Sequence, residues 1–62
     1  MSTVESILMK RDRLSKEEAH HQKMIAQMAI MEAIENGDYD EAEDIMMDEL
    51  GLEMDYIDDV LF

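Results

Sequence analysis

The sequence contains no cysteine, no proline and no tryptophan, and its only glycines are Gly37 and Gly51. The absence of cysteine excludes disulfides and thiolate metal sites and gives no sign of an oxidising compartment. The absence of proline removes the strongest helix breaker, and residues that favour helices, such as Ala, Met, Leu, Glu and Lys, are abundant. Few residues are β-branched or aromatic, which argues against strands. These scarcities together favour an all-helical fold.

Long apolar runs are missing as well. A membrane-spanning helix needs about 18–20 consecutive apolar residues, and no stretch of this sequence approaches that length. The N-terminal residues also lack the basic and then apolar pattern of a secretory signal. We therefore expect a soluble cytoplasmic protein that does not bind membranes. A chain of 62 residues has a marginal core, because it hides only about 60% of the surface that it exposes when unfolded.

Capping signals delimit four expected helices within a single domain of residues 1–62, at residues 4–13, 16–35, 39–50 and 54–61. Ser2 with Glu5, and Ser15 with Glu18, have the spacing of a capping box, in which two side chains satisfy free backbone amides at a helix start. Asp38 can cap the third helix with its carboxylate. The first three of these helices therefore have a sequence signal close to their first residue, and the last helix has none.

Glycine marks two of the expected helix ends. At Gly37 and at Gly51 the chain can adopt the left-handed conformation that commonly terminates a helix. The predicted fold class is all-α: a small bundle of three to four helices with one long central helix over residues 16–35. Because so small a core gains stability from a partner subunit, we expect self-association to complete the bundle.

The long helix carries an unusually apolar segment. Residues 24–34 have the sequence MIAQMAIMEAI, in which only Gln27 and Glu32 are polar. A helix on the side of a small bundle needs an apolar stripe, whereas this segment is apolar nearly all round. A second copy of the chain would cover the excess. We therefore expect a homo-oligomer with contacts at Met24, Met28, Met31 and Ile34.

The sequence contains eight methionines. We interpret Met28 and Met46 as core residues. Methionine also occurs at adaptable binding surfaces, because its side chain is unbranched and polarisable. Since one small subunit cannot bury them all, some of the others should face a partner.

Charge is divided unevenly along the chain. The first 23 residues hold all five basic side chains and four acids, whereas the remaining 39 hold thirteen acids and no Lys or Arg. Thirteen acids in so short a segment repel one another, and a basic partner would relieve that repulsion. The alternative is a solvated face that only keeps the protein soluble. Direct binding of nucleic acid is not expected, because phosphates need cations that this half lacks.

The third expected helix concentrates part of this charge. It places Asp40, Asp44 and Asp48 at intervals of four residues, with Glu41 and Glu49 alongside. Like charges at this spacing weaken an isolated helix by a few tenths of a kcal/mol per pair. Such a row suits a surface that meets Lys and Arg, so we predict that these five residues bind a basic protein.

The sequence offers no catalytic, cofactor or metal site. No nucleophile stands near a base and an orienting group, and the glycines do not form a phosphate-binding loop. Glu17 and His21 share a helix face at metal-ligand spacing, but two ligands do not make a site, and an exposed ion pair is the preferred interpretation. The acids of residues 38–44 lack the glycine that an EF-hand loop needs at its sixth position. We expect a protein that is not an enzyme.

Three resemblances accompany these patterns. Residues 37–42 (GDYDEA) resemble the start of the second helix of a tetratricopeptide repeat, which we interpret as a helix–turn–helix packing signal because no repeat follows. Residues 57–62 (IDDVLF) resemble the acidic and hydrophobic tails with which replication and late-transcription proteins bind sliding clamps, without the usual glutamine. The alternative for this segment is a last amphipathic turn that closes the core. Over its whole length, the chain resembles the small acidic early proteins of bacteriophages, which often bind and disable a host factor.

The leading hypothesis is a helical interaction protein, phage-encoded, that binds and modulates or inhibits a basic partner such as a nucleic-acid-handling enzyme. Its location would then be the cytoplasm of the host cell. Two alternatives stay open. The chain could be a subunit of a larger helical assembly, or an oligomer that sequesters a small anion or nucleotide through the basic residues between Arg11 and Lys23.

Overall fold

Ser15 begins the longest helix, α2 (Lys16–Glu35), in the computed structural model, which describes residues 3–62. The Ser15 Oγ atom accepts a hydrogen bond from the backbone N–H of Glu18 at 3.1 Å. In return, the Glu18 Oε1 atom accepts one from the backbone N–H of Ser15 at 2.8 Å. This reciprocal capping box confirms the predicted helix start.

The chain leaves α2 through a Schellman motif and enters α3 (Tyr39–Ile45). Gly37 has a φ of 73°, in the left-handed region that glycine adopts without strain. The N–H groups of Gly37 and Asp38 donate to the carbonyl oxygens of Ile34 and Ala33, each at 2.9 Å. The Asp38 carboxylate then accepts the N–H of Glu41 at 3.1 Å. The predicted stop and the predicted cap are both confirmed.

The third helix does not continue as one α-helix to residue 50, as the sequence predicted. It ends at Ile45, and a turn of π-helix, η1 (Met46–Leu50), follows. Gly51 ends η1 with a φ of 64°. The N–H of Gly51 donates to Met47 and that of Leu52 to Met46, at 2.9 and 3.2 Å. Each bond reaches one residue further back than in a Schellman motif on an α-helix, which fits the wider π turn.

The first and last helices are shorter than predicted. Helix α1 covers Thr3–Arg11, and the left-handed φ of 56° at Arg13 excludes the predicted helix end at that residue. A 3₁₀ turn, η2 (Met54–Tyr56), precedes α4 (Ile57–Leu61), so the last predicted helix is α-helical only in its second half. The predicted cap at Ser2 lies outside the described residues.

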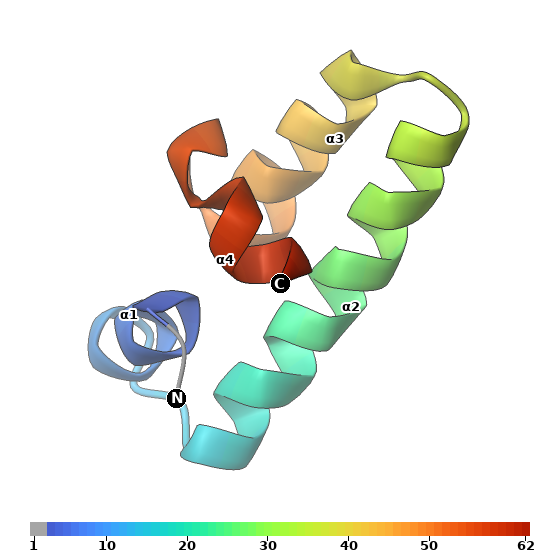
Figure 1. The fold of residues 1–62 in the computed structure, drawn as a ribbon. Helices are drawn as coiled ribbons and strands as arrows, with labels where there is room; N and C mark the ends of the chain where they lie inside the picture. Colours follow the sequence, from blue (N-terminus) through green and yellow to red (C-terminus); the bar gives the residue numbers. More distant parts are fainter. Residues whose placement is uncertain (1–2) are drawn as a thin grey trace.

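The helices α1, α3 and α4 pack against α2, and α4 lies between α1 and α3 (Figure 1). The fully buried core takes side chains from α1, α2, α3, η1 and α4: Val4, Leu8, Ala19, Ala26, Ile30, Ala42, Met46, Leu50 and Val60. The molecule is all-α and elongated, with principal extents of 33 × 16 × 16 Å. No helix in the described range is long and apolar enough to cross a membrane.

The two methionines expected in the core differ. Met46 is completely buried, as predicted, but the prediction for Met28 is wrong, because its side chain is 68% exposed. Small alanines on the inner side of α2 let the other helices approach closely, and Met28 lies on the opposite side. The final turn buries Val60 and partly buries Ile57, which agrees with the alternative interpretation that this turn closes the core.

Candidate functional site

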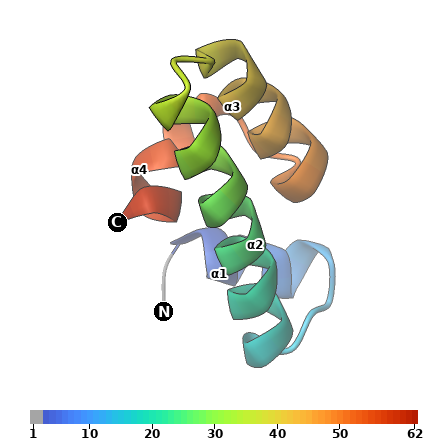
Figure 2. The same cartoon turned by 90° about the vertical axis from the view of Figure 1, so that its right-hand side faces the viewer.

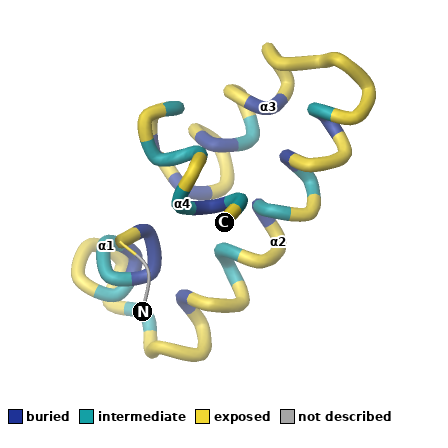
Figure 3. Tube along the Cα trace, viewed as in Figure 1, coloured by how far each residue is buried: buried dark blue, intermediate teal, exposed yellow. Residues whose placement is uncertain are grey.

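One face of α2 is exposed to solvent and the other is buried (Figure 3), and the middle of the exposed face carries large apolar side chains. Its three methionines are exposed to 39% at Met24, 68% at Met28 and 47% at Met31. Ile25, beside them, is 44% exposed. Figure 2 views the molecule from the side on which α2 lies in front of the other helices. We call these four residues the α2 apolar surface.

Phe62 extends this apolar area next to Met31. Its side chain is 97% exposed, and it lines a shallow cavity of about 200 Å³ together with Met31, Ile34, Glu35 and Leu61. Ile34, which the sequence grouped with the methionines, is half-buried in this cavity wall. Sequence analysis missed Ile25 and Phe62 as contributors. The signal for Ile25 was present in the apolar run, but the place of Phe62 depends on how α4 packs.

The five predicted partner-binding residues all lie on the continuous segment of α3 and η1, and all are exposed: Asp40, Glu41, Asp44, Asp48 and Glu49. Within residues 3–62 none of the five forms an ion pair. Gln22 of α2 donates to the backbone oxygen of Glu49 at 2.9 Å and to its carboxylate at 3.4 Å, which ties η1 to α2. We call these five residues the acidic surface.

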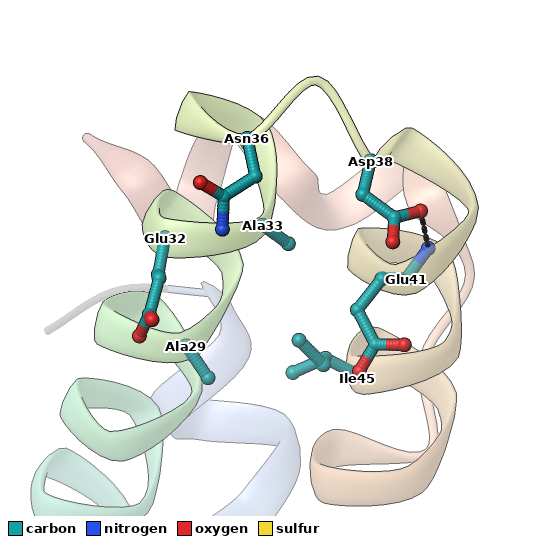
Figure 4. Close-up of a pocket in the computed structure, with 7 residues that line it drawn as sticks. All are labelled: Ala29, Glu32, Ala33, Asn36, Asp38, Glu41 and Ile45. Carbon is teal, nitrogen blue, oxygen red and sulfur yellow. Dashed lines mark hydrogen bonds between the residues drawn. The ribbon is translucent and has the colours of Figure 1, made fainter.

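A groove of about 270 Å³ separates α2 from α3 beside the acidic surface (Figure 4). Ala29, Ala33 and Ile45 point into the space between the helices, while Glu32 and Glu41 lie on the α2 side and the α3 side. An apolar interior with carboxylates at its edges suits a Lys or Arg side chain, which buries its methylene stem and keeps its charge at the rim. Sequence analysis missed Glu32, because only the packing of α3 against α2 brings it near Glu41.

Glu5 is a buried acid that connects α1 to α2. Its Oε2 atom lies 3.2 Å from Nδ1 of His20 and 3.4 Å from Nζ of Lys23, and its side chain is only 9% exposed. Burial raises the pKa of Glu5, but the hydrogen bonds and charges of His20 and Lys23 outweigh burial, so the net pKa lies below its ordinary value of 4.5. The sequence had assigned Glu5 only to the first helix cap.

Two of the four basic residues from Arg11 to Lys23 are already paired with acids. Arg11 donates from Nη2 to the Leu50 carbonyl oxygen at 2.6 Å and to Asp12 at 2.8 Å, so its charge is already engaged. Lys23 is paired with Glu5. A cavity of about 500 Å³ near Lys16 is also lined by Glu5 and Glu17, whose carboxylates repel anions. This arrangement disfavours the anion-sequestering alternative.

The structure also places the histidines. Glu17 and His21 are not within ion-pair distance, and the imidazole that contacts a carboxylate in the described range is that of His20. In the same range, no three or more His, Asp or Glu side chains are grouped so that they could hold a metal ion. Comparison with known proteins gives no match to a protein-family model, a curated protein or a solved structure. The apolar and acidic surfaces are therefore the basis for a functional proposal.

Proposed function

We propose that this chain is a non-enzymatic helical interaction protein that binds a basic surface of another protein through its acidic surface, and thereby modulates or inhibits that partner. The observation that carries the proposal is the exposure of all five carboxylates of this surface, with no ion pair to any of them in the described range. Like charges on one helix oppose its folding, so a basic partner would relieve a cost that the free protein bears.

The groove between α2 and α3 supports this proposal by offering an anchor point. A Lys or Arg of the partner can place its stem against Ala29, Ala33 and Ile45 and its charge between Glu32 and Glu41. Surfaces rich in Lys and Arg are typical of proteins that handle nucleic acids, so such a protein is the expected kind of partner. If the chain is phage-encoded, this partner would be a host protein in the cytoplasm.

We further propose that the protein acts as a homo-oligomer, assembled through the α2 apolar surface. Four large apolar side chains on one helix face are exposed at 39–68%. A contiguous exposed apolar patch rimmed by polar residues commonly marks a protein–protein contact. The acidic surface lies on other helices, so both surfaces can be occupied at the same time.

The test is quantitative capture from a bacterial lysate, followed by kinetics on the purified captured protein. The variant Asp40→Asn/Asp44→Asn/Asp48→Asn should lose capture of the partner and associate about tenfold more slowly at low salt, because complementary charge acts mainly on the association rate. Its association rate should also depend less on ionic strength.

A matched control separates local recognition from overall charge. Glu53, Asp55 and Asp58 are exposed acids outside the acidic surface, and the variant Glu53→Gln/Asp55→Asn/Asp58→Asn removes the same amount of charge. The control should capture the partner and bind at nearly the wild-type rate. Equal losses in both variants, or no loss in either, would mean that the acidic surface only keeps the protein soluble.

A subunit of a larger helical assembly is the second candidate, and the α2 apolar surface together with Phe62 favours it. Phe62 is 97% exposed beside Met31, so the apolar area reaches beyond a single helix. Light scattering distinguishes the two candidates. A large defined ring or filament without a basic partner supports the assembly role, and a small oligomer that captures a basic protein supports the interaction protein.

A further inference from the structure

We infer that two copies of the chain pair through α2 in antiparallel orientation, with a two-fold axis at Met28, so that Glu35 of one copy faces His21 of the partner subunit. This inference rests on the proposed self-association and deepens it, because it fixes the orientation and the register of the contact. The arrangement follows from the order of side chains along the exposed face, from the division of charge in the chain, and from the length of α2.

The exposed face of α2 is a stripe with polar ends. Met24, Met28 and Met31 follow at intervals of four and three residues, which keeps them on one side of the helix. The same spacing continues to His21 at one end and to Glu35 at the other, and both are exposed. An apolar middle therefore lies between a hydrogen-bonding imidazole and a carboxylate.

The charge of the chain selects the antiparallel orientation. A parallel pair would place Glu35 against Glu35 and bring together two halves that each hold thirteen acids and no Lys or Arg. An antiparallel pair places each acidic half beside the partner's N-terminal half, which holds all five basic residues of that copy. Like charges across a contact are costly, and opposed helix dipoles add a further preference for antiparallel packing.

The stripe also selects the register. With Met28 on the axis, Ile25 lies opposite Met31 of the partner subunit, and Met24 lies opposite the partner's Glu32, whose side chain is also exposed. His21 then lies opposite the partner's Glu35, where an imidazole N–H can donate to a carboxylate. A shift by one helical turn in one direction would instead place Glu35 opposite Glu17 of the partner subunit, which is a contact between two acids, and a shift in the other direction would place Glu35 opposite Ile25 of the partner subunit.

The size of the contact is adequate for a dimer. Twenty residues of α-helix are about 30 Å long, close to the 33 Å long dimension of the molecule. A specific interface buries about 800 Å² on each partner, which is near a fifth of the 4294 Å² of accessible surface. A contact along the whole of α2 can supply this area. It leaves both acidic surfaces free, because α3 packs on another side of α2.

Single cysteines test the geometry, because the chain has none of its own. We would prepare Met28→Cys, His21→Cys and Glu35→Cys, all at exposed positions, oxidise each full-length protein with diamide, and measure covalent dimer on non-reducing gels. A disulfide forms only when the two Cα atoms approach to about 7 Å or less. In the inferred dimer Met28→Cys is next to its own copy, whereas each of the other two positions is about 21 Å from its own copy along the axis.

The inference expects Met28→Cys to cross-link at least about tenfold faster than either other single variant. It also expects a mixture of His21→Cys and Glu35→Cys chains to cross-link to each other. Rapid cross-linking of His21→Cys or Glu35→Cys with itself would show parallel helices and overturn the inference. Dimers in which no variant or mixture cross-links would place the contact elsewhere, and would overturn it as well.

Sedimentation of the unmodified protein separates this inference from the proposal on which it rests. A monomer at high micromolar concentration would contradict the proposed self-association altogether. A dimer with the wrong cross-links would contradict only the antiparallel register. Charge provides an independent check. His21→Glu should raise the dissociation constant of the dimer about two- to thirtyfold, the combined size of the two symmetry-related ionic contacts, and Glu35→Lys in the same chain should restore it.

Discussion

The carboxylate of Asp59 accepts a hydrogen bond from the backbone N–H of Val4 at 2.8 Å, across 55 residues of sequence. The first N–H groups of a helix have no partner within the helix, and their partial positive charge favours an acid. Asp59 supplies that acid to α1, while its neighbour Val60 is completely buried, as is Val4. One acid of the C-terminal half therefore has a structural role in joining the last helix to the first.

Replacing Asp59 with alanine should destabilise the protein by about 1 kcal/mol, the usual effect of losing a helix cap. For a domain of this size, that corresponds to a fall in Tm of about 4–8 °C. Asp58→Ala is the matched control, because it removes the same charge from an exposed neighbour. Thermal unfolding followed by circular dichroism compares the two, and equal Tm values would contradict a capping role for Asp59.

The helix boundaries that the sequence predicted well are those set by local chemistry. Ser15, Gly37 and Asp38 act on backbone groups only a few residues away, so their effect is visible in a short stretch of sequence. The same holds for the exposure of the acidic residues on α3, because carboxylates without a nearby cation stay in water. Local signals thus located the second helix and the start of the third.

The features that the sequence did not predict depend on contacts between distant segments. Met28 is exposed because α1, α3 and α4 all pack on the other faces of α2, and no local pattern distinguishes it from Ile30, which is buried. Glu5 was assigned to a helix cap, yet its partners His20 and Lys23 come from α2. The π turn at η1 has the same glycine stop as an α-helix, so Gly51 alone could not reveal it.

We expect the protein to tolerate alanine less well at Gly51 than at Gly37. Both have positive φ, which costs a non-glycine residue about 1 kcal/mol. A Cβ atom at Gly37 would meet nothing within 4 Å, whereas one at Gly51 would lie 3.2 Å from Nη1 of Arg11. Gly51→Ala should therefore lower the free energy of unfolding more than Gly37→Ala does, by about 1 kcal/mol, measured by urea denaturation.

The additional loss of unfolding free energy in Gly51→Ala should arise from displacement of Arg11. This side chain donates to the carbonyl oxygens of Leu50 and Gly51 at 2.6 and 3.3 Å. In the background of Arg11→Ala, the two glycine variants should lose the same free energy relative to that background. If Gly51→Ala stays costlier without the guanidinium, the difference has another source.

The lowered pKa of Glu5 predicts how the stability of the fold depends on pH in the acid range. Its pKa in the folded protein is below the ordinary value of 4.5, so the folded state binds its proton less readily than the unfolded state. The contribution of Glu5 is therefore fully present above pH 4.5 and is lost as the pH falls through the lower pKa of the folded state. We expect Glu5→Gln to be less stable than wild type at pH 6. The two proteins should become equally stable at a pH below the pKa of Glu5 in the folded state.

The comparison across pH requires an exposed acid as a control, because all carboxylates titrate in this range. Glu53→Gln has the same change of charge at an exposed site, and its stability difference from wild type should be small throughout. A difference between Glu5→Gln and wild type that persists undiminished at the lowest pH would mean that the charge of Glu5 contributes nothing to stability.

The acidic surface allows folding and binding to be separated, because Asp40 and Asp48 lie in the first and last turns of one helical segment. Asp40 is in the first turn of α3, where the helix dipole favours an acid, and Asp48 is in the last turn of the continuous α3–η1 segment, where the dipole disfavours one. We expect Asp40→Asn to destabilise the free protein, and Asp48→Asn to stabilise it, by about 0.3–1 kcal/mol each.

Both changes remove one charge from the surface, so both should slow association with a basic partner to a similar extent. Thermal unfolding at low and high salt, combined with association rates, would measure the two effects, and salt should reduce both. If the association rate instead followed stability, rising in one variant and falling in the other, the acidic surface would act through the fold rather than by contact with the partner.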